Sequence, residues 1–411
     1  MRIIVMATMM LASCGGTSGW QTDAGADAHP PGDGAQAEEG TADAFPSDRA
    51  ATDSMIADGP ADVAASDGPV TDGAAAWVPY GLLSLNLHCL KLDGTVFTDN
   101  ETRFAAIAQA AAAESVGAIV VQEACREGSV DAMALLESAL EAATGGAWSS
   151  AWAFAHTAWA GTADEAEEGV GILARGTLED VETLEYAVQR PLRRVAIGAR
   201  LPATLGGIRL WSTHLEVVDA TVRLAQARQT ASALATMSAP AFDVVVGGDF
   251  NAAASEAPCK AMSAYDFRDL SDGLQADRID HIYAHRGAGL EAARAMTVFD
   301  GTSYPVVSDH HGVLVTVAPT APEPHISTVI RIRADVGWGH FLSVRGNRAP
   351  LDWTAGWPAV PTASSEWKLV LTAFEPGVTF EYKCLRDDVV WQSGPNATGT
   401  GGSVNEVVPV F

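Results

Sequence analysis

Between residues 77 and 318, short apolar runs alternate with segments whose apolar residues recur at helical spacing. Apolar runs bounded by polar or glycine positions are typical of buried strands, and they recur at residues 82–87, 118–122, 169–174, 195–201, 208–213, 243–247, 279–284 and 312–317. Apolar positions at helical spacing predict helices over residues 99–115, from about Ser129 to the glycines at 145–146, and near residues 221–237. The alternation predicts an α/β fold, a layered sandwich with helices covering the sheet, with antiparallel pairing between 195 and 213.

A different pattern, with apolar and polar residues in alternation, follows residue 325. Residues 329–333, 367–371 and 379–385 alternate in this way, and a turn at 386–388 leads into 389–391. Prolines between 318 and 324 predict a linker over 319–324, so residues 325–411 are expected to form a small antiparallel β-sandwich. Its five tryptophans exceed the needs of so small a core, which favours stacking on sugar rings, with core packing for some of them.

The composition of the N-terminal residues predicts an export signal followed by a tether. Arg2 precedes an apolar run, and the segment ends in Leu11-Ala12-Ser13-Cys14, which predicts a signal peptide over residues 1–14. This end resembles the lipobox of bacterial lipoproteins, which implies export, lipidation at Cys14 and anchoring to a bacterial membrane, at the outer membrane or cell surface. An ordinary secretory signal is the alternative. Residues 15–76 hold twelve acidic residues and one basic residue without an apolar face, which predicts a disordered acidic tether.

The net charge and the cysteines limit which kinds of binding site the chain can form. The chain has 25 Lys and Arg against 51 Asp and Glu, a net charge of −26, which excludes a passive basic nucleic-acid binder. A protein of this charge that handles phosphate is expected to use a divalent metal. No C-x-x-C pair supports a zinc ribbon. Cys89 and Cys125 each follow a predicted strand, so a disulfide between them is possible, and the sequence leaves it open.

Polar side chains suited to catalysis stand at the ends of six predicted strands. They are Asn86, Glu123, His214, Asp249 with Asn251, Asp280, and Asp309 with His310. Any one of them is more often a turn residue, a cap or a structural histidine. Together they predict one active site, because loops at strand ends are where a rigid scaffold holds reactive groups.

The tripeptides and tetrapeptides around these residues form an ordered set. They are Leu85-Asn86-Leu87, Val121-Gln122-Glu123, Thr213-His214-Leu215, Gly248-Asp249-Phe250-Asn251, Arg278-Ile279-Asp280 and Ser308-Asp309-His310. In this order they resemble the endonuclease/exonuclease/phosphatase superfamily, which includes deoxyribonucleases, abasic-site endonucleases, sphingomyelinases and inositol-polyphosphate phosphatases. The resemblance covers residues 77–318 and implies a deoxyribonuclease-like sandwich that hydrolyses phosphoesters.

Phosphoester hydrolysis requires that the negative charge on the phosphoryl oxygens be neutralised. Hard oxygen donors suit Mg²⁺, with Mn²⁺ or Ca²⁺ as alternatives, and the predicted metal ligands are Asn86, Glu123 and Asp309. The resemblance also implies an arginine that contacts phosphate. Arg193 and Arg194 both qualify, and a surface salt bridge is the alternative for either.

The reaction also requires a base that takes a proton from the attacking water. A carboxylate beside an imidazole fixes its tautomer and raises its basicity, so we expect His310 paired with Asp280 to be that base. His214 is expected to bind the phosphate or to protonate the leaving oxygen. By the resemblance, Asp249 and Asn251 orient water and phosphate.

The C-terminal residues carry a second resemblance. Leu351-Asp352-Trp353, Phe380–Lys383 and Trp391–Asn396 resemble the family-20 starch-binding module. This implies that α-glucan or another polysaccharide binds to Trp353, Lys383, Trp391 and Asn396. Leu351 and Gln392 depart from the family pattern, which makes the module type firmer than starch as its ligand.

The leading hypothesis is therefore an exported, lipid-anchored, metal-dependent phosphoesterase, a phosphodiesterase or nuclease, with a glycan-binding module. Its substrate is nucleic acid, a phospholipid headgroup, or a sugar or inositol phosphate, and its contact with membrane is through the anchor alone. Sphingomyelinase or sugar/inositol phosphatase activity is one alternative. A non-catalytic polysaccharide-binding surface lipoprotein is another. We expect a monomer.

Overall fold

Two mixed sheets form the part of the chain that carries the predicted active-site residues. The computed structural model describes residues 77–189, 192–372 and 374–411, so the predicted signal peptide, Cys14 and the tether lie outside the described residues. The first sheet has the order β12 (Leu290–Val298), β13 (Gly312–Pro319), β1 (Tyr80–Asn86), β2 (Val116–Glu127), β5 (Ala166–Arg175) and β4 (Trp148–Ala158), with the short β3 (Val130–Asp131) paired to β2. The second has the order β10 (Phe267–Asp269), β11 (Asp280–His285), β9 (Val244–Asp249), β8 (Arg209–His214), β7 (Val195–Arg200) and β6 (Glu179–Glu185).

An apolar core lies where the two sheets face each other. Leu82, Val120, Val245 and Ile282 in it have no exposed surface, and each such side chain contributes about 1.5–3 kcal/mol by its removal from water. Because β1, β2 and β9 are buried on both faces, their sequences read as largely continuous apolar runs rather than as alternation. This explains why the sequence shows them so clearly.

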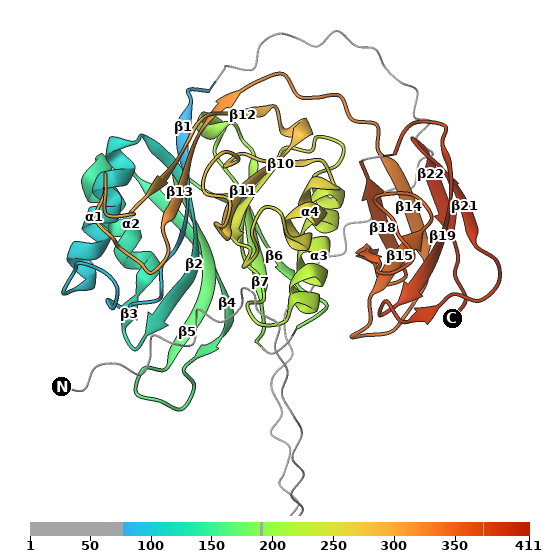
Figure 1. The fold of residues 1–411 in the computed structure, drawn as a ribbon, viewed down its shortest axis with the longest axis horizontal. Helices are drawn as coiled ribbons and strands as arrows, with labels where there is room; N and C mark the ends of the chain where they lie inside the picture. The colour runs from blue at the N-terminus through green and yellow to red at the C-terminus, as the bar shows by residue number, and fades with distance from the viewer. Residues whose placement is uncertain (1–76, 190–191, 373) are drawn as a thin grey trace, which may run out of the picture. The chain divides into compact units, whose positions relative to one another are not determined.

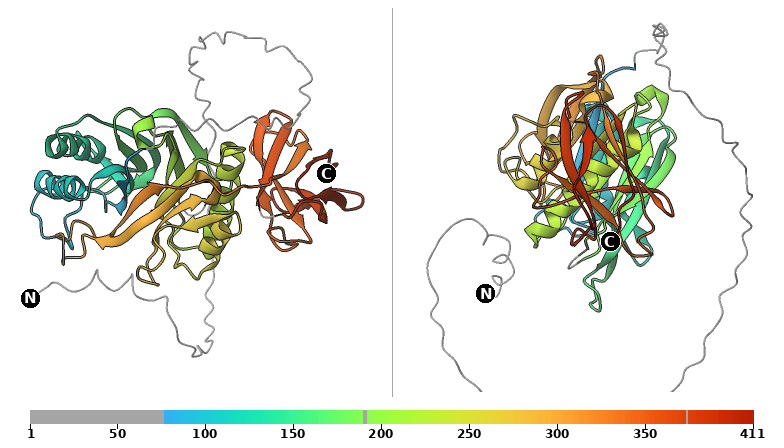
Figure 2. Two further views of the ribbon diagram at one scale, coloured as in Figure 1. Left: turned by 90° about the horizontal axis from the view of Figure 1, so that it is seen from above. Right: turned by 90° about the vertical axis from the view of Figure 1, so that its right-hand side faces the viewer.

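Helices cover the outer faces of both sheets, as Figures 1 and 2 show. On one side lie α1 (Asn100–Ala113) and α2 (Ala132–Thr144), and on the other lie α3 (Ala220–Ser238) and α4 (Ala257–Ser263). Short 3₁₀ turns span Ala203–Leu205 and Arg286–Ala288. The layered α/β sandwich predicted from the sequence is therefore confirmed, including the antiparallel pairing of β7 with β8.

Two predicted details need correction. The second helix begins at Ala132 and not near Ser129, because the side chain of Asp131 accepts hydrogen bonds from the backbone nitrogens of Met133 and Ala134 and acts as the N-cap. The tryptophan-rich segment around residue 152 is β4, an edge strand that the sequence did not reveal. Within the described ranges, no helix combines the length and apolar character that crossing a bilayer requires.

The C-terminal residues form two smaller sheets (Figure 1). One has the order β17 (Val360–Ala363), β18 (Glu366–Leu371), β14 (Thr328–Arg333) and β22 (Val404–Val407). The other has the order β16 (Trp357–Pro358), β15 (Leu342–Gly346), β19 (Thr379–Arg386) and β20 (Val390–Trp391), with β21 (Ala397–Thr400) paired to β19. These β-sandwich-like strands agree with the predicted fold class, although β14 and β22 run parallel where the sequence predicted an antiparallel sandwich.

Candidate functional site

Strand pairing in the second sheet places three of the predicted site residues side by side. His214 at the end of β8 lies opposite Asp249 at the end of β9, and Asp249 lies opposite Asp280 at the start of β11. Directly paired residues on neighbouring strands point to the same face of a sheet. The three side chains therefore form a row at one edge of this sheet.

The first sheet contributes Asn86 and Glu123 to the same place. Asn86 ends β1, and its parallel partner in β2 is Gln122 rather than Glu123. The pairing of β2 with β5 shifts register between Val121 and Ala124, and Glu123 has a left-handed φ of 46°. Such a bulge re-aims a side chain. The Nδ2 of Asn86 accordingly donates to Glu123 Oε1 at 3.0 Å and to Asp249 Oδ2 of the other sheet at 3.3 Å.

A histidine outside the predicted set, His88, lies between the two carboxylates that were expected to hold a metal. Its Nδ1 is 3.1 Å from Asp309 Oδ2 and 3.9 Å from Glu123 Oε2. The hydrogen bond to Asp309 is the main cause that raises the pKa of His88 above its usual value. Glu123 and Asp309, which are far apart in the sequence, therefore both lie beside the same imidazole.

The donors at this point fit a divalent cation. Glu123 and Asp309 offer carboxylate oxygens, and the Oδ1 of Asn86 accepts one hydrogen bond, from the His88 backbone at 2.9 Å, which leaves its second lone pair. A second group of possible ligand atoms, those of Asp249, Asp280 and His310, lies within 4.8 Å of one another. Within that group His310 is already hydrogen-bonded, which favours a role in proton transfer.

His310 and Asp280 form the expected pair. The Nδ1 of His310 is 2.8 Å from Asp280 Oδ2, and its Nε2 is 3.8 Å from Asp249 Oδ2. Burial alone would lower the pKa of His310, but the hydrogen bond to Asp280 and the nearby carboxylates outweigh it and raise that pKa to about 10. Burial, together with the charge of Asp280, raises the pKa of Asp249 to about 7.

The environment of His214 fixes which of its nitrogens carries hydrogen. Its Nδ1 is 2.9 Å from the Nη1 of Arg194, and a guanidinium can only donate, so Nδ1 is an acceptor and the hydrogen is on Nε2. That Nε2 faces Asp249 Oδ2 at 3.6 Å. Burial and the charge of Arg194 lower the pKa of His214 well below its usual value. The geometry thus favours hydrogen bonding by a neutral imidazole over proton donation.

The structure distinguishes the two candidate arginines. Only 4% of the Arg194 side chain is exposed, and it lies against His214 and Glu168 inside the site. Arg193 instead forms an ion pair with Glu185 and donates to the Phe154 carbonyl oxygen, which is the surface alternative that the sequence allowed. Arg194 is therefore the arginine that contacts the predicted site residues.

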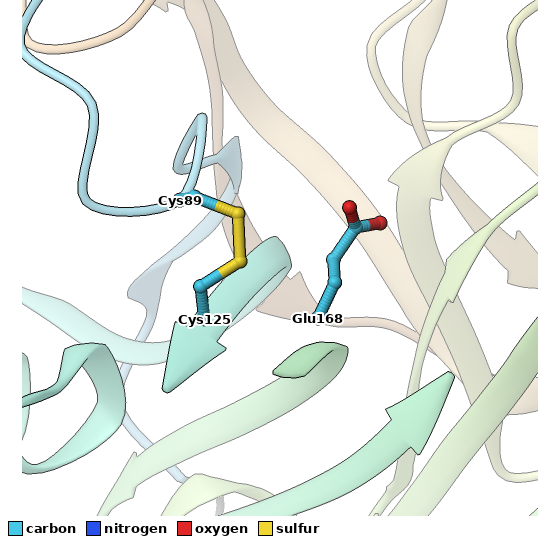
Figure 3. A group of neighbouring side chains, drawn as sticks. All are labelled: Cys89, Cys125 and Glu168. Carbon is cyan, nitrogen blue, oxygen red and sulfur yellow. A yellow bond between two sulfur atoms is a disulfide. The ribbon is translucent and has the colours of Figure 1, made fainter. Parts of the chain in front are cut away.

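A disulfide joins Cys89 and Cys125 beside Glu168, as Figure 3 shows. The two Cα atoms are 4.7 Å apart. Because both sulfurs are bonded to each other, this group of two cysteines and a glutamate offers no thiolate to a metal. Burial is the main cause that raises the pKa of Glu168 to about 7, and the charge of Glu123 adds to it.

A cavity of about 290 Å³ opens next to His310 and Asp309. Arg278, Gln275, Thr297 and His311 are among the residues that line it. Polar side chains of both charge signs therefore surround the space beside the candidate base, which has room for part of a substrate.

Of the four predicted carbohydrate-binding residues, Lys383 lies on β19 and Trp391 on β20, whereas Trp353 and Asn396 lie in loops. The rings of Trp353 and Trp391 have centroids 6.2 Å apart, and Trp391 is 42% exposed. Lys383 Nζ donates to the carbonyls of Gln392 and Gly394. Asn396 Nδ2 donates to Glu381 Oε2 at 2.9 Å. The two indoles thus lie side by side, whereas Lys383 is bonded to backbone carbonyls and the amide of Asn396 to a carboxylate.

Two residues near the site were missed by the sequence reasoning. His88 follows Asn86 by only two positions, and this proximity to a predicted ligand was the available signal. Arg103 is fully buried and donates to the carbonyls of Leu87, Cys89 and Lys91, so it holds the loop that carries His88. Nothing in the sequence marks Arg103, because it stands within an apolar helical stripe.

Comparison with known proteins gives a family match. The model of the Endonuclease/Exonuclease/phosphatase family matches residues 83–310, just over half of the chain. This range contains all the residues that were predicted to bind metal or to take part in catalysis. A search of curated proteins found no significant match.

Solved structures of similar fold include several from bacteria. An endonuclease/exonuclease/phosphatase family protein from Leptotrichia buccalis is 15% identical, with 58% of this chain and 99% of that chain covered and a TM-score of 0.46. A mannosyl-6-phosphatase from Bacteroides thetaiotaomicron is 13% identical, with 58% and 99% covered and a TM-score of 0.44. A sphingomyelinase C from Streptomyces griseocarneus is 17% identical, with 58% and 99% covered and a TM-score of 0.38.

Proposed function

The chain belongs to the Endonuclease/Exonuclease/phosphatase family and is thus a hydrolase of phosphoester substrates, and we propose that it is a metal-dependent phosphodiesterase that cleaves nucleic acid. The proposal rests on one observation. His214, Asp249 and Asp280 lie in a row, and the carboxylates of Glu123 and Asp309 lie near it. In-line attack on phosphorus requires hydrogen-bond donors, carboxylates and an imidazole paired with a carboxylate, and all of these lie at one edge of the sheet.

Each side chain has a defined part in this proposal. Asp280 holds His310 through Nδ1, which leaves Nε2 to take a proton from the water that attacks phosphorus. The raised pKa of His310 belongs to the site without a cation, and a cation held at Asn86, Glu123 and Asp309 would lower it, so that the neutral imidazole is the form that acts as base. The Nε2–H of His214 and the guanidinium of Arg194 hydrogen-bond the phosphoryl oxygens. Asn86, Glu123 and Asp309 would hold Mg²⁺ or a similar cation, which when bound neutralises charge on the phosphoryl group.

A substrate panel tests the proposal. We expect the tether-free protein to cleave plasmid DNA or RNA with Mg²⁺ and not with EDTA, and the Asp309→Ala and His310→Ala variants to lose this activity while remaining folded. Cleavage of sphingomyelin or of inositol or sugar phosphates instead would replace nucleic acid as the substrate. Wild-type rates in either variant would overturn the site.

A second proposed function is polysaccharide binding by the C-terminal strands. The partly exposed Trp391 beside Trp353 supports it, because flat indoles stack on sugar rings. We expect retention on insoluble starch that Trp391→Ala abolishes, and Trp338→Ala is the matched control, since Trp338 is fully exposed and is not one of the four predicted carbohydrate-binding residues. Equal retention of wild type and Trp391→Ala would contradict this function.

We also propose that the protein is exported and anchored by lipid at Cys14, as its N-terminal sequence indicates. Full-length protein should then sediment with membranes and incorporate labelled fatty acid. Cys14→Ser should be soluble and unlabelled. A membrane-bound, unlabelled wild type would contradict lipidation.

A further inference from the structure

We propose that His281 is a positioning residue that holds the turn at residues 249–252 in the shape the active site requires. The inference rests on the proposed function, because Asp249 and Asn251 in this turn belong to the proposed active site. His281 follows Asp280 on β11. Successive side chains of a strand point to opposite faces, so His281 points away from the face that carries Asp280 and acts on the site from behind.

Both ring nitrogens of His281 carry hydrogen, because each faces a group that accepts. The side chain is fully buried, with Nε2 3.0 Å from the Ala252 carbonyl oxygen and Nδ1 3.0 Å from Asp269 Oδ2. A carbonyl oxygen has no hydrogen to donate. The Asp269 oxygen accepts a second hydrogen bond, from Arg278 Nη2 at 2.5 Å, and therefore acts as a carboxylate. The imidazole is thus a bridge with one donor on each side.

Asp269 gives this bridge a fixed end. It is the last residue of β10, and its Oδ1 accepts a hydrogen bond from the backbone nitrogen of Ser271 at 2.8 Å. Because Oδ2 is bonded to Arg278 and to His281, both oxygens of the carboxylate are engaged. Charge-assisted hydrogen bonds of this kind are about twice as strong as neutral ones. The His281 ring is therefore held in one orientation, with Nε2 directed at the turn.

The turn at residues 249–252 begins at the end of β9 and finishes at the Ala252 carbonyl. Between these ends, Asn251 has a left-handed φ of 48°, and its backbone nitrogen donates to Asp249 Oδ1 at 2.8 Å. A left-handed residue keeps that conformation where the surrounding contacts impose it. The Ala252 carbonyl accepts from His281 Nε2, and its other neighbour is the weakly donating Sγ of Cys259 at 3.5 Å. His281 therefore supplies the stronger of these two contacts at this end of the turn.

A shift of the turn would reach the reacting groups through Asp249. Its Oδ1 would lose the backbone donor of Asn251, which fixes the carboxylate. The Oδ2 of the same carboxylate faces His214 Nε2 at 3.6 Å and His310 Nε2 at 3.8 Å. Misplacement of catalytic groups by about 1 Å can slow an enzyme about 100-fold. His281 is therefore expected to act on kcat from a position behind the substrate.

Two amide substitutions separate the two halves of the bridge. The side-chain nitrogen of glutamine extends about as far as the Nε2 of histidine, whereas that of asparagine extends only about as far as Nδ1. His281→Gln therefore keeps a donor for the Ala252 carbonyl, and His281→Asn keeps a donor for Asp269 alone. The matched controls are His285→Gln and His285→Asn at the other end of β11, where the buried ring of His285 stacks on Phe242.

Hydrolysis of bis(4-nitrophenyl) phosphate by the full chain with Mg²⁺ is the first measurement. We expect His281→Asn to lower kcat about tenfold with KM changed by less than about threefold, because the turn and not the binding of substrate is disturbed. His281→Gln and both controls should keep kcat within about threefold of wild type. Equal kcat in wild type and His281→Asn would overturn the inference, and so would a tenfold loss in folded His281→Gln.

Amide hydrogen exchange of the peptides that span residues 249–252, followed by mass spectrometry, is the second measurement and needs no substrate. The N–H of Asn251 should exchange about tenfold faster in His281→Asn than in wild type, and at about the wild-type rate in His281→Gln. Equal exchange in wild type and folded His281→Asn would overturn the inference. If His281→Asn fails to fold, faster exchange in folded His281→Gln would overturn it. A wild type that shows no turnover with any divalent cation would overturn the proposed function alone, because the exchange rates still decide whether His281 holds the turn.

Discussion

Breaking the disulfide between Cys89 and Cys125 should destabilise the protein by an amount that follows from the loop it closes. The two cysteines are 36 residues apart in the sequence, and closing a loop of that length removes unfolded-state entropy worth about 4 kcal/mol at 25 °C. Both side chains are 1% exposed, so the Cys89→Ala/Cys125→Ala variant also loses some packing. We therefore expect its free energy of unfolding to fall by about 4 kcal/mol.

Urea denaturation of wild type and of this double variant, each with and without a dithiol reductant, measures the effect. The wild type should lose stability when reduced, and the double variant should be indifferent to the reductant because no bond remains to be broken. Mass spectrometry of alkylated protein confirms that the wild type was reduced. A wild type whose unfolding midpoint stays constant after complete reduction would refute the reasoning.

Three other perturbations test separate parts of the account. Arg194→Met should lower kcat/KM by about 100-fold, because His214 loses the donor that fixes its tautomer; a rate within twofold of wild type would exclude that role. Burial lowers the pKa of His285 to about 3, so below pH 6.5 the unfolded chain binds the proton more readily and stability should fall as pH drops, by at most about 1.4 kcal/mol per unit. In the His285→Gln variant, the urea midpoint should change less between pH 7 and pH 5 than it does in wild type. An equal change in the two proteins would contradict this. Gly248→Ala should cost about 3 kcal/mol, since its Cβ would lie 2.0 Å from a backbone carbonyl, whereas Gly146→Ala, which meets nothing within 4 Å, should be nearly neutral in the same denaturation assay.

Much of the fold could be predicted because its central strands are buried on both faces. The runs that became β1, β2, β9 and β13 are continuous and apolar, and the polar residues that end them were visible for the same reason. The edge strand β4 was not predicted, since its burial pattern is irregular and shows no clear alternation. The short C-terminal strands β16, β17 and β21 have two to four residues, too few to show a period.

The site could be predicted as a set of residues but not as a geometry. Glu123 reaches Asn86 only because a bulge and a left-handed backbone turn it, and local sequence carries no mark of either. His88 was overlooked because its place over Glu123 and Asp309 depends on a loop held by Arg103 and a disulfide, both of which are tertiary contacts. The tautomer of His214 likewise depends on an arginine from another strand end.

Hydrolysis of bis(4-nitrophenyl) phosphate by the chelator-treated protein tests the central claim most directly. The account predicts no turnover until a divalent cation is added, full turnover afterwards, and less than about one hundredth of that rate in folded Asp309→Asn at the same cation concentration. Turnover by the wild type in EDTA, or a wild-type rate in Asp309→Asn, would contradict a cation-dependent phosphoesterase at this site.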